Sequence, residues 1–362
     1  MSDTTIKAGL FVCVLAILIG ISPSRSAAQA VTTDFEFTSE GRVLSGVLDV
    51  PAGGTAEAMI VFVHGYGPTD VRGRDMYADL RTRFNALGIA TAVWDKPGQG
   101  RSEGTFDIDQ PVHESAQEVL DAAAHLRARN VPGSHRMGIW GVSRAGWIAP
   151  IALSQDPGFD FWISVSGTTA EDNFRYLLIS NLPHEGYSAE EADRIDREWQ
   201  RGWEIFRAGG SYDSYRDATP TLRANEYVTR MLGGIMSRDE YEAEQSAYLE
   251  HQGPPYLDPA SGAFVHIHDF DRMLGGLDID VLAIFGEKDL NVDWRRTRAL
   301  YETTIGRNPD ASLQIRTFPD ADHNIVDSET GSIREMQEGG RRDPSASFYS
   351  TQTEWLRDVV LD

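Results

Sequence analysis

The stretch IWGVSRAGWIAP, residues 139–150, begins as an apolar run, breaks at Gly141 and continues as a helical pattern. Ser143 lies at the break, and Ala145 follows it two residues later. A nucleophilic serine at a sharp turn between a strand and a helix needs a strained backbone, and large side chains two residues to either side would collide there. Glycine-flanked serines also occur in ordinary turns. A catalytic interpretation therefore requires a base, an acid and an anion site elsewhere in the chain.

Around this stretch, apolar runs alternate with amphipathic ones, as in a mostly parallel sheet covered by helices. Runs rich in Val, Ile and Phe predict buried strands at 58–63, 89–94, 136–140, 160–166, 280–285 and 312–318. Helical patterns predict helices at 76–87, 112–129, 144–155, 293–305 and 346–361. Two alternating segments within 34–50 predict an antiparallel hairpin on the edge of the sheet. The fold class is therefore α/β.

The alternation stops between about residues 169 and 271, where no strand is evident. Trp199, Trp203 and Phe206 recur there at helical spacing, so we expect a helical insertion between two strands. We expect these aromatic residues to pack between the insertion and the core. Between Glu171 and His251 the insertion has seventeen acidic residues against nine arginines, most of them interpreted as the solvated faces of helices.

Residues 1–30 have the layout of a secretory signal peptide. Lys7 precedes an apolar stretch over 8–21, and Ala28 and Ala30 fit the small-x-small rule for cleavage after Ala30. Fourteen apolar residues fall short of the ~20 that a membrane-spanning helix needs. We therefore expect a secreted or periplasmic protein with no stable membrane anchor after cleavage. Cys13, the only cysteine, would be removed with the signal, which leaves no thiol for a disulfide, a metal site or a nucleophile.

The charge of the chain disfavours polyanionic partners. The formal net charge is −22, and residues 1–30 carry a net +1, so the mature protein would carry −23. Such a surface repels nucleic acid, and the expected partner is a small molecule. No cofactor motif is found and no metal is required. The nearest metal-site pattern, His266 and His268 before Asp269, lacks a third ligand and is interpreted as a loop.

An anion site is predicted next to Ser143. The turn His64-Gly65-Tyr66-Gly67 directly follows the apolar run 58–63, where a glycine-bearing turn can aim backbone N–H groups at a carbonyl oxygen. We expect the N–H groups of Tyr66 and Arg144 to form the oxyanion hole.

A base and an acid follow in order along the chain. A serine hydroxyl is a poor nucleophile until an imidazole takes its proton, and a carboxylate must hold that imidazole in one tautomer. Of the nine histidines only His323 follows the last predicted strand, and Asp289 follows the strand before it. Asp320 and Asp322 are rival carboxylates, but they share a turn with His323 and are interpreted as turn formers.

The segment Trp94-Asp-Lys-Pro-Gly-Gln-Gly-Arg-Ser102 resembles the loop after the fourth strand in α/β-hydrolases, which often has the form D-x-P-G-x-G-x-S. With the motifs around residues 64, 143, 289 and 323, the resemblance covers nearly the whole mature chain. It implies a core of residues 31–168 and 272–362, with a helical cap of residues 169–271 inserted after the sixth strand. It also implies Ser143 as nucleophile, His323 as base and Asp289 as orienting acid.

The subgroup that the chain most resembles includes esterases and serine aminopeptidases. A serine at 143 separates it from the dehalogenases and epoxide hydrolases, which have aspartate there. Ala145, where glycine is more usual, and Pro150, inside the expected helix, depart from the pattern without disabling the chemistry. We expect hydrolysis of carboxylic esters through an acyl-enzyme, with aminopeptidase or amidase activity as the alternative. An acyl thioesterase and a non-catalytic binding module remain open.

Overall fold

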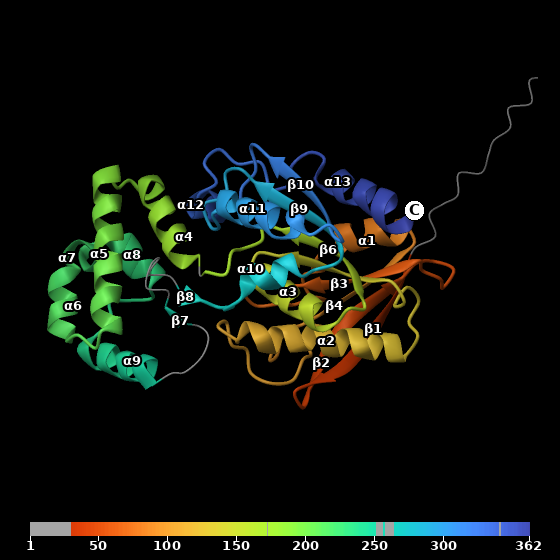
Figure 1. Cartoon of the computed structure of the whole chain (residues 1–362), viewed down its shortest axis with the longest axis horizontal. Helices are drawn as coiled ribbons and strands as arrows, with labels where there is room; N and C mark the ends of the chain where they lie inside the picture. Colours follow the sequence, from red (N-terminus) through yellow and green to blue (C-terminus); the bar gives the residue numbers. More distant parts are fainter. Residues whose placement is uncertain (1–29, 172, 251–255, 258–263, 340–341) are drawn as a thin grey trace, which may run out of the picture.

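The chain is described by a computed structural model over residues 30–171, 173–250, 256–257, 264–339 and 342–362. The predicted apolar runs form six parallel strands at its centre (Figure 1). They are β3 (Ala58–Val63), β4 (Ile89–Trp94), β5 (Met137–Val142), β6 (Phe159–Val165), β9 (Asp280–Gly286) and β10 (Ser312–Phe318). Their order across the sheet is β4-β3-β5-β6-β9-β10. The predicted mostly parallel sheet is confirmed.

The predicted antiparallel hairpin forms one edge of this sheet. Strand β1 (Val31–Ser39) pairs with β2 (Arg42–Val50) in the register Val31 to Val50, and β2 pairs antiparallel with β4. The two residues of the turn, Glu40 and Gly41, both have positive φ, at 47° and 76°. Two-residue turns of this kind match the right-handed twist of the strands that they join.

Helices cover both faces of the sheet because successive strand residues point to opposite sides. Along β3, Met59 and Val61 join one core cluster, whereas Ile60 and Phe62 join the other. The first face carries α2 (Val112–Ala128), α3 (Ala145–Gln155), α10 (Phe270–Gly275) and α11 (Trp294–Thr303). The second carries α1 (Ala78–Ala86), α13 (Phe348–Trp355) and the π-helical end η3 (Leu356–Leu361). The predicted helices occur in these places.

The segment between β6 and β9 is mainly helical and extends to one side of the sheet (Figure 1). We call residues 169–271 the insertion. Its elements before α10 are α4 (Phe174–Asn181), η1 (Leu182–Glu185), α5 (Ala189–Arg207), α6 (Tyr212–Ala218), α7 (Pro220–Ala224), α8 (Glu226–Met231), α9 (Arg238–Glu250), β7 (Tyr256–Leu257) and β8 (Phe264–Val265). It has a small core of its own, which includes Leu178, Ile195 and Tyr227. The β7–β8 pair was not expected, because two-residue strands are too short to show an alternating pattern.

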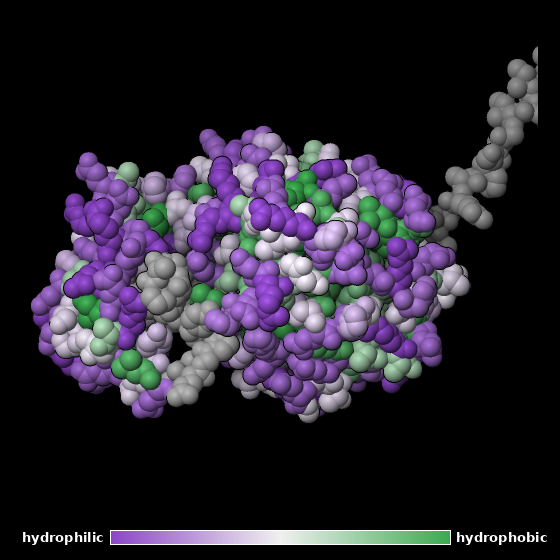
Figure 2. All heavy atoms as spheres, viewed as in Figure 1, coloured by the Kyte–Doolittle hydropathy of each residue, from purple (hydrophilic) through white to green (hydrophobic). Residues whose placement is uncertain are grey.

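The remaining elements are the short η2 (Ile305–Arg307) and α12 (Ile333–Glu338). The predicted signal peptide lies outside the described residues except for Ala30. Among the helices that the structure describes, none has the length and apolar character needed to cross a bilayer. The face of the molecule in Figure 2 is mostly hydrophilic, with scattered hydrophobic residues.

Candidate active site

The turn between β5 and α3 holds Ser143 in a strained conformation. Its φ is 55°, in the left-handed region that residues other than glycine rarely adopt. A Cβ on Gly141 would lie only 2.7 Å from the Ala145 Cβ, which explains why both positions carry small residues. The Ser143 amide donates to the Val165 carbonyl at 2.9 Å and so anchors the turn to β6. The strand, turn and helix predicted for residues 139–150 are all present.

Ser143, His323 and Asp289 form one hydrogen-bonded series. The Ser143 hydroxyl lies 2.9 Å from His323 Nε2, and His323 Nδ1 lies 2.7 Å from Asp289 Oδ2. Because an ionised carboxylate only accepts, Nδ1–H donates to Asp289 and Nε2 is left to accept from the serine. Asp289 Oδ1 accepts from the amides of Asn291 and Val292, so the carboxylate is held from both sides. The structure thus brings together the three residues selected from the sequence.

The carboxylate sets the protonation of His323. Burial alone would lower the pKa of this imidazole, but the charge and hydrogen bond of Asp289, with the charge of Asp322, outweigh burial and raise the pKa above its ordinary value. The buried His323 ring is therefore a better proton acceptor than a histidine in water.

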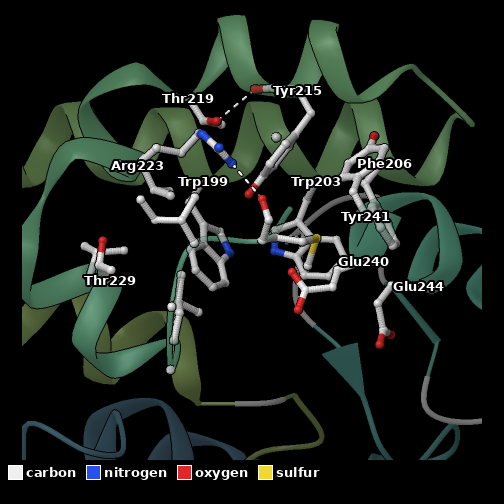
Figure 3. Close-up of a pocket in the computed structure, with 18 of the residues that line it drawn as sticks. Trp199, Trp203, Phe206, Tyr215, Thr219, Arg223, Thr229, Glu240, Tyr241 and Glu244 are labelled. Atoms are coloured by element: carbon white, nitrogen blue, oxygen red, sulfur yellow. Dashed lines mark hydrogen bonds between the residues drawn. The ribbon is translucent and has the colours of Figure 1, made fainter. Parts of the chain in front are cut away.

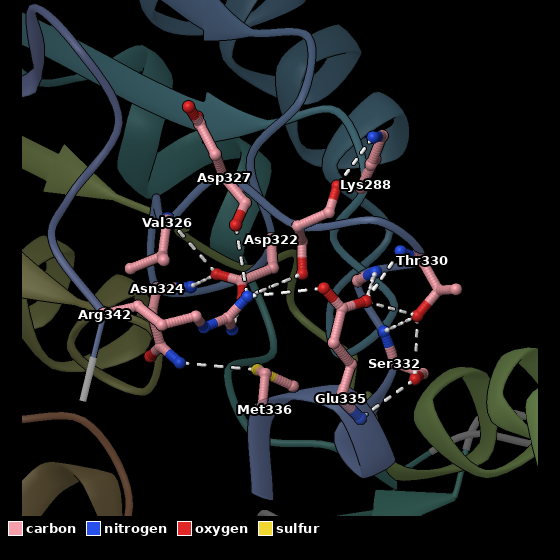
Figure 4. A network of polar contacts seen from close by, with 12 residues as sticks. Lys288, Asp322, Asn324, Val326, Asp327, Thr330, Ser332, Glu335, Met336 and Arg342 are labelled. Atoms are coloured by element: carbon pink, nitrogen blue, oxygen red, sulfur yellow. Dashed lines mark hydrogen bonds and ion pairs between the residues drawn. The ribbon is translucent and has the colours of Figure 1, made fainter. Parts of the chain in front are cut away.

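The rival carboxylates have structural partners instead. Asp322 Oδ2 pairs with Arg342 Nη2 at 2.7 Å, and Asp322 Oδ1 accepts from the amides of Asn324 and Val326 (Figure 4). Asp320 pairs with Lys288 at 3.1 Å. Asp322 therefore stabilises the turn that carries His323.

A second carboxylate completes this network. Glu335, on α12, accepts from the amides of Glu329 and Thr330 and from the Thr330 hydroxyl (Figure 4). Burial opposes its ionisation, but these hydrogen bonds outweigh burial and lower the pKa of Glu335 to about 2. Arg342 bridges Glu335 and Asp322, so the loop after β10 is held by charge as well as by its turns.

The residues predicted to form the anion site lie beside the serine. A Cβ on Gly65 would be 3.4 Å from the Ser143 Cβ, so the turn that contains Tyr66 lies against the strand-to-helix turn that holds Ser143. Arg144 is the N-cap residue of α3, and its N–H is one of the N-terminal amides that a helix leaves without an internal partner. The Arg144 guanidinium is occupied elsewhere, because it donates to Ser115 Oγ at 3.1 Å and to the Gln110 carbonyl.

Several solved hydrolases share this architecture. Esterase Pf2001 from Pyrococcus furiosus aligns with a TM-score of 0.50 and 14% identity over 91% of this chain and 93% of its own. Est1E from Butyrivibrio proteoclasticus, solved with ferulic acid bound, gives 0.50 and 15% over 90% and 98%. The alpha/beta hydrolase GrgF from Penicillium sp. sh18 gives 0.50 and 16% over 92% and 100%. This chain has the α/β-hydrolase fold. No protein-family model and no curated protein sequence matches it.

Within this fold, His64 has a structural role. Its Nε2–H donates to the Trp94 carbonyl at 2.6 Å, and its Nδ1 accepts from the Tyr77 hydroxyl at 3.1 Å. Burial lowers the pKa of His64 to about 4, so this ring is neutral and holds the turn after β3 in place. Tyr77, which has a positive φ of 59°, was not singled out from the sequence, because no motif marks it.

The segment 94–102 ties the edge hairpin of the sheet to the turn after β3. Ser102 Oγ donates to the Asp95 carbonyl at 2.7 Å and accepts from the Ser45 amide at 3.0 Å. Asp95 Oδ1 accepts from the Val71 amide at 2.8 Å. Gly100 has a φ of 53°, and a Cβ there would lie 2.0 Å from Asp95 Oδ2. The motif is therefore a brace, in which Ser102 bonds to main-chain atoms of Ser45 and Asp95.

Helix α4 of the insertion contacts the loop that carries Asp289. The Tyr176 hydroxyl donates to the Asp289 carbonyl at 3.2 Å, and Ser180 Oγ donates to the Leu290 carbonyl at 2.8 Å. Asn181 Oδ1 accepts from the Ile333 amide at 2.8 Å, at the start of α12. These residues could not be selected from the sequence, because they bond to main-chain atoms more than a hundred positions away.

A cavity of about 730 Å³ lies inside the insertion (Figure 3). Aromatic residues of α5, α6 and α9 line it: Trp199, Trp203, Phe206, Tyr215, Tyr241 and Tyr248. The expected packing of Trp199, Trp203 and Phe206 between insertion and core is wrong, because their rings contact one another and the insertion's own Phe174, Tyr241 and Tyr248. Helical spacing showed that they share a face but could not show what that face meets.

The pair His266 and His268, interpreted from the sequence as part of a loop, lies in a loop. His266 lies in the loop after β8, and its ring centroid is 4.5 Å from that of Trp147. Over the described ranges, no three His, Cys, Asp or Glu side chains are arranged to hold a metal ion.

Proposed function

We propose that this protein is a serine hydrolase that cleaves carboxylic esters through an acyl-enzyme. The observation that carries the proposal is the series from Asp289 through His323 to Ser143, with the serine held at a left-handed turn. A protein with this fold that served only as a binding module would have no need of that arrangement.

In the first half of the reaction, Ser143 Oγ attacks the substrate carbonyl carbon while its proton passes to His323 Nε2. The carbonyl oxygen becomes an oxyanion, which the N–H groups of Tyr66 and Arg144 would stabilise together with the N-terminus of α3. Asp289 stabilises the imidazolium that forms. Collapse of the intermediate breaks the ester C–O bond, and His323 gives its proton to the departing alcohol oxygen.

In the second half, water attacks the acyl group on Ser143 and His323 takes the proton from that water. A second oxyanion forms and collapses, the bond from the acyl carbon to Ser143 Oγ breaks, and His323 returns a proton to the serine. The products are an alcohol and a carboxylic acid, and the enzyme is restored without any cofactor.

The charge of the chain favours neutral substrates. The net charge of −22 and the acidic insertion would repel an anionic thioester such as an acyl-CoA. One of the solved proteins with this fold, Pf2001, is named as an esterase, which supports the same choice. Small neutral acyl esters are therefore the proposed substrates.

A second candidate is a serine aminopeptidase or amidase, whose substrate amine would be held in the cavity of the insertion. Glu240 and Glu244 are among the residues that line it, together with the aromatic rings (Figure 3). Carboxylates next to aromatic faces suit a substrate with a free amine. Glu240→Gln combined with Glu244→Gln would then raise KM for amino-acid anilides and leave ester hydrolysis unchanged.

The test combines covalent labelling with a substrate panel. A fluorophosphonate should label the protein once, on the peptide that carries Ser143, and Ser143→Ala should abolish labelling and hydrolysis without changing the circular dichroism. Ser154→Ala, at the far end of α3 where Ser154 Oγ only donates to the Ile151 carbonyl, is the matched control and should retain full activity.

The panel contains neutral acyl esters, amino-acid anilides and acyl thioesters assayed side by side. We expect the highest kcat/KM for esters. Faster turnover of free-amine anilides would select the second candidate, and wild-type activity in Ser143→Ala would refute both.

A further inference from the structure

A buried lysine lies beneath the turn that contains Tyr66. The 33 basic residues of the chain include only three lysines, Lys7, Lys96 and Lys288. Lys96 lies two residues after the end of β4, and 9% of its surface is exposed. Burying an ammonium costs free energy unless its N–H groups are hydrogen-bonded, so Lys96 needs acceptors that offset this cost.

Those contacts are carbonyl oxygens of the turn after β3. Lys96 Nζ donates to the Gly65 carbonyl at 2.6 Å and to the Gly67 carbonyl at 2.9 Å. The Lys96 amide donates to Thr69 Oγ1 at 2.9 Å, so main chain and side chain both hold the same turn. The ammonium therefore clamps the two carbonyls on either side of Tyr66.

The clamp fixes the direction of one N–H group. In a trans peptide the carbonyl of one residue and the N–H of the next point in opposite directions. When the Gly65 carbonyl points at Lys96, the Tyr66 N–H must point away from Lys96. Gly65 itself lies against the turn that holds Ser143. A Cβ added to Gly65 would be 3.4 Å from the Ser143 Cβ. A cation on the carbonyl also polarises the peptide and strengthens its N–H as a donor.

We propose that Lys96 is a positioning residue of the oxyanion hole, which aims and polarises the Tyr66 N–H by clamping the Gly65 and Gly67 carbonyls. This inference rests on the proposed function, because it assigns Tyr66 the role of oxyanion donor. A lysine suits the task better than an arginine, because a compact ammonium can bind two separate carbonyls as a point charge, whereas a guanidinium presents a planar fork.

The charge of Lys96 changes within the pH range over which ester hydrolysis would be assayed. Burial and the nearby charge of Arg144 lower the pKa of Lys96 to about 8, while the charge of Glu118 on α2 opposes them. His64 also lies near enough for the charge of Lys96 to help lower its pKa, and Arg42, Asp107 and Glu114 line a small pocket together with Lys96. Loss of the proton above about pH 8 would weaken the clamp, because a neutral amine polarises the peptide less.

The experiment compares Lys96→Met and Lys96→Arg with the wild type on a neutral ester. Loss of a whole oxyanion donor typically costs on the order of 100-fold or more in turnover, and a donor that is only misaligned should cost less. We expect kcat to fall by roughly 10-fold to 100-fold in Lys96→Met, with KM changed by less than about twofold. Lys96→Arg keeps a charge, so it should retain more activity than Lys96→Met.

The pH profile separates this role from simple support of the fold. The wild type should lose activity above about pH 8, and this alkaline limb should be absent in both variants. Arg101→Met is the matched control: it removes a cation from the same segment, but Arg101 pairs with Asp34 of β1 and does not contact the turn. It should keep wild-type kcat and the alkaline limb.

Failure of this inference can be told apart from failure of the proposed function. Fluorophosphonate should still label Lys96→Met once per chain at Ser143, at a rate reduced in line with kcat. If the wild type is labelled at Ser143 and Lys96→Met keeps wild-type kcat, or keeps the alkaline limb, the role of Lys96 is wrong and the hydrolase remains. If the wild type is not labelled at Ser143, the proposed function itself is wrong.

Discussion

The imidazole of His323 can accept the serine proton only when it is neutral, so its pKa sets the acidic limit of activity. Burial favours the neutral form, but the charge and hydrogen bond of Asp289, with the charge of Asp322, outweigh burial and raise the pKa. Activity should therefore rise with pH through a value above the ordinary histidine pKa of 6.5. In Asp289→Asn the charge is lost, so this limb should move to lower pH. Turnover should also fall on the order of 10⁴-fold, because an amide does not hold the required tautomer.

The measurement is kcat/KM for a neutral ester between pH 4 and pH 9. A second variant, Asp320→Asn, removes a carboxylate of the same region that forms an ion pair with Lys288, and it should leave turnover within about twofold of the wild type. An acidic limb that does not move in Asp289→Asn would contradict the role of Asp289.

Helix α4 shows how an element without any catalytic group can support the site. Asn181 is buried, accepts from the Ile333 amide and donates to the Leu177 carbonyl at 2.8 Å. Asn181→Ala leaves the Ile333 amide without this acceptor, which should lower the free energy of unfolding by about 1–3 kcal/mol. Activity should fall with it, because α4 contacts the loop of Asp289 and also the start of α12, which follows the loop of His323.

Chemical denaturation and ester assays of the same preparation would check this. Gln200→Ala is the control: Gln200 makes an exposed bond to Asp196 on α5, and its loss should change the free energy of unfolding by less than about 0.5 kcal/mol. Equal stability of Asn181→Ala and the wild type would show that α4 does not brace these loops.

Only part of the fold and of the candidate site could be predicted from the sequence. The strands were predictable, because strands buried in a sheet consist of apolar residues. The turn at Ser143 was predictable as well, because the small space between Gly141 and Ala145 admits only small residues. The order of Ser143, Asp289 and His323 at strand ends followed from the same pattern. Lys96 and Asn181 were not predictable, because each bonds to main-chain atoms, which any residue type provides. The face of α5 that meets the cavity was not predictable either, since spacing gives a shared face and not its partner.

At the scale of the whole molecule, the net charge of −22 and the mostly hydrophilic face in Figure 2 disfavour polyanionic partners. We propose that the chain is exported and cut after Ala30. Strand β1 begins at Val31, which pairs with Val50, so a cut at this bond would leave the whole edge strand intact. A cut further along would remove residues that hold the hairpin together.

The intact mass of exported protein tests this directly, and the expected mass is that of residues 31–362. Signal cleavage requires a small residue just before the cut, so Ala30→Arg should block processing, whereas Gln29→Arg leaves both small positions unchanged and should still be cut. The processed and unprocessed forms should show the same ester activity, because β1 lies at the edge of the sheet, whereas Ser143, Asp289 and His323 follow β5, β9 and β10. A mass that retains Met1, or an N-terminus inside β1, would refute the cleavage site and leave the assignment of Ser143 untouched.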